Sequence, residues 1–209
     1  MRDPASLGHW AGSASTITSD GIRFVKRDAP FRQIREVPEY HFTDIGKEDR
    51  VVDIGANVGA FCLRAARYSS HVFAIEPVSF DLLEENIALN NAAVVAVKCA
   101  LGAGNPAEIA WDDCRVWSPT FSLGTIIEMA GGCDFLKCDA EGAEWLIRPA
   151  DLGGIRRIEM ELHIPPISPP PNRELLDALG REFDFSIDRS PVHSTLGVMG
   201  ILHAVRKKN

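Results

Sequence analysis

The fold of this 209-residue chain is decided by the stretch Val51-Val52-Asp53-Ile54-Gly55-Ala56-Asn57-Val58-Gly59-Ala60-Phe61. Its first residues are mostly apolar and β-branched, which is typical of a strand covered on both faces. Gly55 and Gly59 allow a tight turn and let a ligand approach the backbone closely. An apolar helix is predicted to follow. The stretch therefore predicts a strand, a glycine turn and a helix N-terminus, which together form a nucleotide-binding corner.

The spacing of the turn residues indicates which nucleotide binds. Asp53-x-Gly55-x-Asn57-x-Gly59 lacks the G-x-G-x-x-G pattern that holds a pyrophosphate in dinucleotide sites. A carboxylate at the strand end would repel a phosphate and suits a cationic ligand such as S-adenosylmethionine, which carries an ammonium and a sulfonium. We therefore expect Asp53 to orient the methionine end and both glycines to make room. Asn57 either donates to the ligand carboxylate or fixes the turn.

A second apolar strand, at residues 71–75, ends in Glu76. An acid about 20 residues beyond the glycine turn is placed to accept hydrogen bonds from both ribose hydroxyls of a nucleotide. The alternative is an ordinary α/β unit with a surface glutamate. That alternative requires two separate features to coincide, so we expect Glu76 to hold the ribose.

Further segments along the chain resemble the FkbM family of S-adenosylmethionine-dependent methyltransferases. The matching segments are 51–61, 74–77, 82–90, 100–102, 135–144 and 158–163. The run Lys137-Cys138-Asp139-Ala140-Glu141-Gly142-Ala143-Glu144 is the most diagnostic, whereas Leu123 is followed by Gly124 where similar proteins usually carry an aspartate. The resemblance implies contacts of Ala100, Leu101 and Asp139 with the cofactor. It also implies O-methylation of a hydroxyl on a sugar, polyketide or other small metabolite.

The acceptor side of the predicted site combines Asp139, Glu161 and His163. Glu161 and His163 lie two apart on a predicted strand and so share a face. His163 has an unperturbed pKa near neutrality, so we expect it to act as general base with Asp139 or Glu161 beside it. Two alternatives stay open: a structural histidine, and a divalent ion held by these three residues. We assign no metal, because the sequence does not fix its geometry.

The order of the predicted elements favours a single-domain, doubly wound, Rossmann-like α/β fold. We expect its seven-stranded sheet to end in a reversed strand, formed by the antiparallel pair 183–188 and 197–206. Residues 1–48 are predicted to be an N-terminal extension, partly mobile, that is a candidate cover for the substrate site, and residues 49–209 the cofactor-binding domain. Short helices are expected at 40–47 and 142–147, and a loop at 102–119. A basic cluster within 23–35 is either a solvated face or a collar for an anionic substrate.

The amino-acid composition narrows the classes of protein to which the chain can belong. Hydrophobic residues make up 45% of the chain and charged residues 24%, which is near the average for soluble globular proteins. The net charge of −7 argues against a protein built mainly to bind nucleic acid. Five cysteines without a C-x-x-C pair favour buried free thiols. With no signal-peptide pattern and no apolar run of about 20 residues, we expect a cytoplasmic protein without a membrane span.

Three alternatives to a small-molecule methyltransferase stay open. The first is a methyltransferase that acts on RNA or another macromolecule. The second is an NAD-dependent oxidoreductase, which the glycine spacing disfavours. The third is a methyltransferase-like fold that only binds a partner. The sequence leaves the oligomeric state open.

Overall fold

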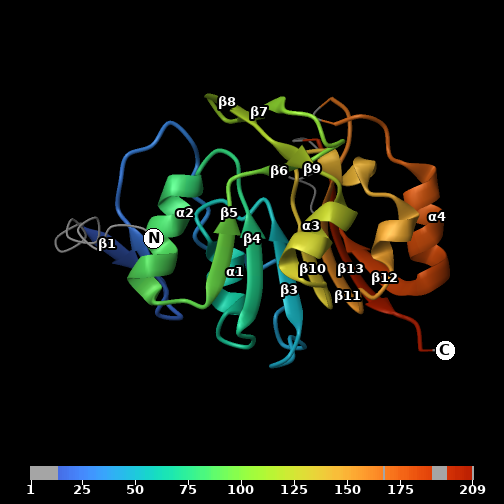
Figure 1. Cartoon of the computed structure of the whole chain (residues 1–209), viewed down its shortest axis with the longest axis horizontal. Helices are drawn as coiled ribbons and strands as arrows, with labels where there is room; N and C mark the ends of the chain where they lie inside the picture. The colour runs from blue at the N-terminus through green and yellow to red at the C-terminus, as the bar shows by residue number, and fades with distance from the viewer. Residues whose placement is uncertain (1–13, 167, 190–196, 209) are drawn as a thin grey trace.

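The computed structural model describes residues 14–166, 168–189 and 197–208, and its centre is a seven-stranded sheet in the order β12-β13-β11-β10-β3-β4-β5 (Figure 1). The strands are β3 (Arg50–Ile54), β4 (His71–Ile75), β5 (Val94–Val97), β10 (Phe135–Cys138), β11 (Arg157–His163), β12 (Phe183–Asp188) and β13 (Val198–Arg206). β13 runs antiparallel to both of its neighbours, and the other neighbouring strands pair in parallel. The predicted doubly wound sheet with a reversed last strand is confirmed.

Helices cover both faces of this sheet. They are α1 (Ala60–Ala65), α2 (Phe80–Asn90), α3 (Leu123–Ala130) and α4 (Arg173–Glu182), with the 3-10 segments η2 (Ala143–Leu146) and η3 (Pro149–Leu152). Side chains alternate along a strand, so Val52 and Leu136 pack in the apolar layer of α3 and α4, whereas Val51 and Phe135 pack in the layer of α1 and α2. Within the described residues, no helix has the length and apolar character needed to cross a bilayer.

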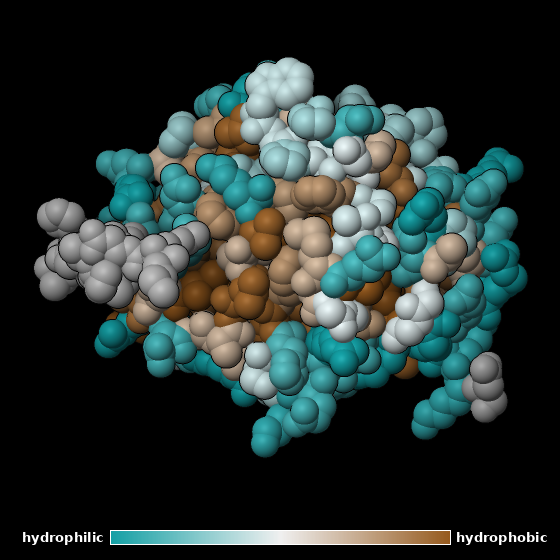
Figure 2. Space-filling view, in the orientation of Figure 1, coloured by the Kyte–Doolittle hydropathy of each residue, from teal (hydrophilic) through white to brown (hydrophobic). Residues whose placement is uncertain are grey.

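The outer strand β5 continues the apolar character of the sheet to its edge. Three of its four side chains are partly buried, and Val95 is exposed. Figure 2 shows apolar side chains gathered on the surface over this strand, bordered by polar ones. The sheet is therefore covered on both faces while its β5 edge stays open.

Within the part of the chain that the structure describes, three two-stranded sheets complete the fold. They pair β1 (Ser15–Ile17) with β2 (Arg23–Val25), β6 (Ala100–Leu101) with β9 (Thr120–Phe121), and β7 (Ala107–Trp111) with β8 (Cys114–Ser118). The hairpin β7–β8 lies beyond the carboxyl ends of the central strands, at the top of Figure 1. Parallel strands end at one edge of a sheet, so the polar residues that end β3, β4, β10 and β11 meet beneath this hairpin.

The hairpin corrects one prediction, because residues 102–119 were expected to form a loop. Exposure alternates along β7, as it does in a half-buried strand. The two strands are joined by Asp112 and Asp113, and Asp112 takes a positive φ of 47°. Two-residue hairpin turns need such φ values, and aspartate accepts them. The abundance of Gly, Asn and Pro in the sequence hid this short pair of strands.

Two predicted helices also differ in the structure. Residues 40–47 form successive turns, because the backbone N–H of His41 donates to the Glu159 carboxylate at 3.2 Å and ties the segment to β11. The helix expected at 142–147 is reduced to the 3-10 segment η2. There the Glu144 carboxylate accepts from the backbone N–H of Gly142 at 2.8 Å, and a separate segment starts at Pro149.

Candidate active site

The glycine turn brings the ends of β3 and β10 into contact. Gly55 has a φ of 71°, and a Cβ built on it would lie 1.8 Å from the carbonyl oxygen of Asp139. The backbone N–H of Asp139 in turn donates to the carbonyl oxygen of Ile54 at 3.0 Å. Glycine is therefore required at position 55, as the sequence predicted, and the close neighbour is the β10 turn.

Two adjoining pockets open at this edge of the sheet. We call them the apolar pocket, which reaches Ile75, and the charged pocket, which reaches His163. Both are lined by Ile34, Gly55, Asn57, Ala110, Trp111, Asp139 and Glu141. The charged pocket has a volume of about 520 Å³, within the range of roughly 300–1,000 Å³ that is typical of small-molecule sites. The apolar pocket is smaller, with a volume of about 100 Å³ by the same measure, and it adjoins the charged pocket along the residues that line both.

Most of the predicted cofactor residues line the apolar pocket. Ala100 and Leu101 contribute to its apolar wall, and Glu76, Asn57 and Asp139 contribute polar groups. Its other walls are apolar side chains from β3, β4, β7 and the turn after β10, namely Ile54, Ile75, Ile109, Ala110, Ala140 and Ala143. Such walls suit a flat aromatic ring such as adenine.

Glu76 is held by three backbone N–H groups. Its Oε1 accepts from Val78 at 2.7 Å and from Ser79 at 2.9 Å, and its Oε2 accepts from Asn57 at 2.9 Å. A carboxylate offers about four acceptor sites, so one remains, on Oε2. The expectation that Glu76 accepts both ribose hydroxyls therefore needs a rearrangement of this loop. Glu76 also fixes the turn around Asn57.

Asn57 and Gly59 stabilise the turn. The Asn57 side chain accepts from the backbone N–H of Ile34 at 3.0 Å and donates to the carbonyl oxygen of Arg32 at 3.3 Å. It thereby attaches the N-terminal segment to the pocket. Gly59 precedes α1 with a φ of 99° and packs against Leu83, and it lines neither pocket. Both roles predicted for Asn57, donation to the ligand and fixing of the turn, stay predictions.

Asp53 lies beneath the pockets. It is completely buried, its Oδ2 accepts from the backbone N–H of Cys62 at 3.1 Å, and its Oδ1 is 3.2 Å from the Lys137 ammonium. Burial raises the pKa of Asp53, although Lys137 opposes this. Asp53 lines neither pocket. Asp53 thus forms an ion pair under the turn, and its orientation of the methionine end stays a prediction.

The sequence reasoning included Lys137 in the diagnostic run but gave it no role in the site. Its ammonium donates to the carbonyl oxygens of Gly55 at 2.8 Å and Ile54 at 3.2 Å, and lies 3.9 Å from Asp139 Oδ2. Burial would lower the pKa of this ammonium, but Asp53 and Asp139 outweigh it and raise the pKa. A lysine inside the apolar run Phe135-Leu136-Lys137-Cys138 was the available signal, because lysine is almost never buried without a partner.

His163 is buried between two carboxylates. Its Nδ1 lies 3.1 Å from Glu144 Oε1 and its Nε2 lies 3.3 Å from Glu141 Oε2. Burial would lower the pKa of His163, but hydrogen bonds to Glu141 and Glu144 raise it to about 11. The ring therefore keeps its proton at neutral pH. The neutral imidazole predicted as general base is not the state that this arrangement favours.

Asp139 and Glu161 provide carboxylates beside His163 in the charged pocket. Burial and the charge of Asp139 raise the pKa of Glu161 to about 8. A side-chain hydrogen bond between Glu161 and Asp139 contributes to this rise of the pKa. The buried Tyr40 hydroxyl has no hydrogen-bond partner among the described residues, and Tyr40 lines the charged pocket. An unsatisfied buried polar atom is costly, so the Tyr40 hydroxyl is a candidate to bind a ligand. Nothing in the sequence singled out Tyr40.

The N-terminal segment contributes the wall of the charged pocket opposite the sheet. Arg32, Val37, Glu39 and Tyr40 line it. Arg32 also lies over the Trp111 ring, with its guanidinium carbon 5.0 Å from the ring centre. Of the basic cluster predicted at 23–35, Arg32 therefore reaches a pocket. The part of the extension before residue 14 lies outside the described residues.

No family model matches the chain. Among curated proteins, the 23S rRNA (uracil(1939)-C(5))-methyltransferase RlmD of Klebsiella pneumoniae (strain 342) is 33% identical over 93 residues, which are 40% of this chain and 21% of that protein. The match thus spans about a fifth of the relative. The resemblance to the FkbM family stays a prediction.

Solved structures show the same fold at low identity. The fibrillarin pre-rRNA processing protein of Methanococcus jannaschii is 12% identical with a TM-score of 0.51, over 96% of this chain and 85% of that one. Trm5b of Pyrococcus abyssi is 17% identical with a TM-score of 0.50, over 93% of this chain and 56% of that one. These similarities show that the chain has the Rossmann-like fold of methyltransferases.

Proposed function

We propose that the chain is an S-adenosylmethionine-dependent methyltransferase that binds this cofactor in the apolar pocket. One observation carries the proposal: among the described residues, the charged side chains that line this pocket are the acids Glu76, Asp139 and Glu141, and no lysine or arginine lines it. A dinucleotide would place a pyrophosphate beside these acids. A sulfonium is attracted to them, and adenine suits the apolar walls.

The second part of the proposal is that the acceptor is a hydroxyl of a small metabolite, a sugar or a polyketide-type molecule, bound in the charged pocket. The adjoining pockets allow the hydroxyl oxygen to approach the methyl carbon in line with the C–S bond. Such positioning supplies roughly 7–11 kcal/mol in favourable cases. As the C–O bond forms and the C–S bond breaks, the hydroxyl proton passes to the Asp139 carboxylate, and S-adenosylhomocysteine is the leaving group. The run at 135–144 supports the finer assignment to an FkbM-like O-methyltransferase.

In this mechanism His163 is a positioning residue. Its paired imidazolium holds Glu141 and Glu144 in place at the start of η2. Lys137 and Asp53 hold the Gly55 turn from below. The carboxylates of the charged pocket are therefore kept at fixed positions beside the methyl donor, which is the main requirement of an in-line displacement.

A second acceptor class is RNA, because the partial match to the curated RlmD concerns an rRNA methyltransferase. The net charge of −7 opposes it, since RNA binding depends on basic surfaces.

A transfer assay tests the proposed function and separates the two acceptor classes. The full chain is incubated with S-adenosylmethionine carrying a labelled methyl group and a cell extract divided into small-molecule and RNA fractions. We expect labelled product in the small-molecule fraction. Label in RNA alone would contradict the proposed acceptor class. Tyr40→Phe removes the unpaired hydroxyl of a residue that lines the charged pocket, and we expect it to lower transfer without changing cofactor affinity.

A further inference from the structure

We propose that Asp139, Glu141 and His163 bind one divalent metal ion of the Mn²⁺ or Mg²⁺ class. Asp139 and Glu141 follow β10, and His163 ends the neighbouring strand β11. One ligand atom from each residue lies within 4.8 Å of the other two. Ligand atoms of an octahedral ion with bonds of about 2.1 Å are about 3.0–4.2 Å apart. Side-chain shifts of about an ångström therefore close the site around an ion.

The imidazole of His163 is already oriented as a metal ligand. The completely buried carboxylate of Glu144 fixes Nδ1 at 3.1 Å, and Nε2 points to Glu141. Histidines that bind metals usually donate their second ring N–H to a carboxylate in this way. The proton on Nε2 and an ion compete for one lone pair, so binding of the ion releases that proton.

A second observation points independently to a ligand. The Tyr40 side chain is 4% exposed, and its hydroxyl has no hydrogen-bond partner among the described residues. Tyr40 lines the same charged pocket as Asp139, Glu141 and His163. Glu141 is 36% exposed and lines both pockets. An ion can therefore enter the cluster from the pocket at Glu141.

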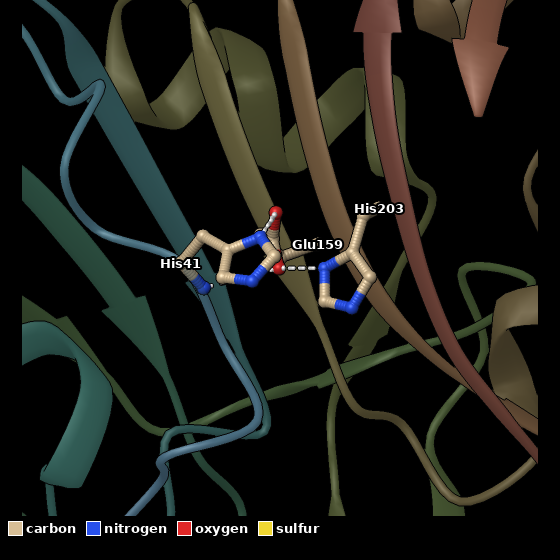
Figure 3. Close-up of side chains that lie close together, drawn as sticks. All are labelled: His41, Glu159 and His203. Atoms are coloured by element: carbon tan, nitrogen blue, oxygen red, sulfur yellow. Dashed lines mark hydrogen bonds and ion pairs between the residues drawn. The ribbon is translucent and has the colours of Figure 1, made fainter. Parts of the chain in front are cut away.

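A second group of similar composition makes a useful contrast. His41, Glu159 and His203 also place one ligand atom each within 4.8 Å of one another, and Figure 3 shows an imidazole on either side of the Glu159 carboxylate. Here, however, the Arg157 guanidinium donates to Glu159 at 2.5 Å and lies 3.1 Å from His41 Nδ1. The position of a cation is already taken by an arginine side chain.

The ring geometry of this second group also opposes metal binding. The imidazoles of His41 and His203 are stacked, with centroids 4.2 Å apart and planes at 25°. The lone pair of an imidazole nitrogen lies in the ring plane, so stacked rings do not aim their lone pairs at one point. His203 Nδ1 instead makes a 2.6 Å hydrogen bond with Glu159. This group ties the turn at His41 to the sheet, and it serves as an internal control.

The role of the ion rests on the proposed function, whereas its binding does not. In methyl transfer, an ion at this place would hold the acceptor hydroxyl oxygen beside the methyl donor and lower the pKa of that hydroxyl. The site itself is defined by the three side chains alone. Metal binding and cofactor binding can therefore be measured separately on the same protein.

The test is a titration of the full chain with Mn²⁺. Binding is monitored by electron paramagnetic resonance as a loss of the free Mn²⁺ signal. The variants are Glu141→Gln and Asp139→Asn in the proposed site, and His41→Ala in the control group, where the His41 side chain is 54% exposed. We expect one ion per chain in the wild type and in His41→Ala. Glu141→Gln and Asp139→Asn should each lower the affinity at least about tenfold, since even outer-sphere changes cost about that much.

Two results would overturn the proposal. One is a wild type that binds S-adenosylhomocysteine but no Mn²⁺, which would leave the proposed function standing. The other is Mn²⁺ binding that survives both Glu141→Gln and Asp139→Asn, or that is lost in His41→Ala, which would place the ion elsewhere. Conversely, Mn²⁺ binding with the expected variant pattern but no binding of S-adenosylhomocysteine would support the metal site and contradict the proposed function.

Discussion

Lys137→Met is expected to destabilise the protein by about 3–5 kcal/mol, because it leaves a buried carboxylate without its cation. Methionine has a similar length and keeps the packing. It removes the ammonium that lies 3.2 Å from Asp53 and donates to the Gly55 carbonyl oxygen. Urea unfolding followed by circular dichroism measures the loss. The double variant Asp53→Asn/Lys137→Met, which has no charge to compensate, should recover a large part of it.

The free energy of unfolding of Lys137→Met should fall as pH rises. Burial raises the pKa of Asp53 in the folded state, and Lys137 is the largest opposing influence. Without Lys137, folded Asp53 keeps its proton to a higher pH than unfolded Asp53 does. The stability of the single variant is therefore full below the unfolded pKa of about 3.9 and falls as pH rises, by up to about 1.4 kcal/mol per pH unit. Equal loss at pH 5 and pH 8, or no recovery in the double variant, would contradict the ion pair.

Gly55→Ala is expected to be far more damaging than Gly131→Ala, although the two glycines have nearly the same backbone conformation. Their φ values are 71° and 75°. An alanine in the left-handed region costs about 1–2 kcal/mol at either position. Only at Gly55 does the new Cβ meet a neighbour, the Asp139 carbonyl oxygen at 1.8 Å, whereas nothing lies within 4 Å at Gly131. The overlap adds about 1–3 kcal/mol or more.

The same pair of variants tests the link between the turn and the pockets. Gly55 and Asp139 line both pockets, so a forced separation of the β3 and β10 ends should also abolish cofactor binding in Gly55→Ala. Gly131 ends α3 and lines neither pocket, so Gly131→Ala should bind the cofactor normally. Unfolding curves and ligand titrations of both variants give the comparison. Equal stability of the two variants would show that the contact at Gly55 is not tight.

The sequence predicted the sheet well because its signals are local. Apolar strands, a glycine turn and the closing pair at 183–206 follow from residue types at short spacing. The hairpin β7–β8 was hidden by the Gly, Asn and Pro around it, whereas the turns at 40–47 were missed because another part of the chain decides them. His41 leaves the helical path since its backbone donates to Glu159, a residue 118 positions away. No local pattern contains that contact.

The sequence predicted where the candidate site lies better than it predicted what each residue does there. Asp139, Glu161 and His163 do line one pocket, because strand ends meet at one edge of a parallel sheet. The role of each side chain depends on partners that a spacing argument does not see. Asp53 lies under the turn because of Lys137, and His163 holds its proton because Glu141 and Glu144 flank it. Lys137 itself could have been found as a charge in an apolar strand.

The central claim is that the apolar pocket binds S-adenosylmethionine, and calorimetric titration of the full chain tests it most directly. S-adenosylhomocysteine is used as the stable probe, and NAD is titrated in parallel. Because the described lining of the pocket carries acids and no lysine or arginine, we expect one S-adenosylhomocysteine site per chain and no saturable heat with NAD. Saturable binding of NAD at one site per chain, with no response to S-adenosylhomocysteine, would contradict the account.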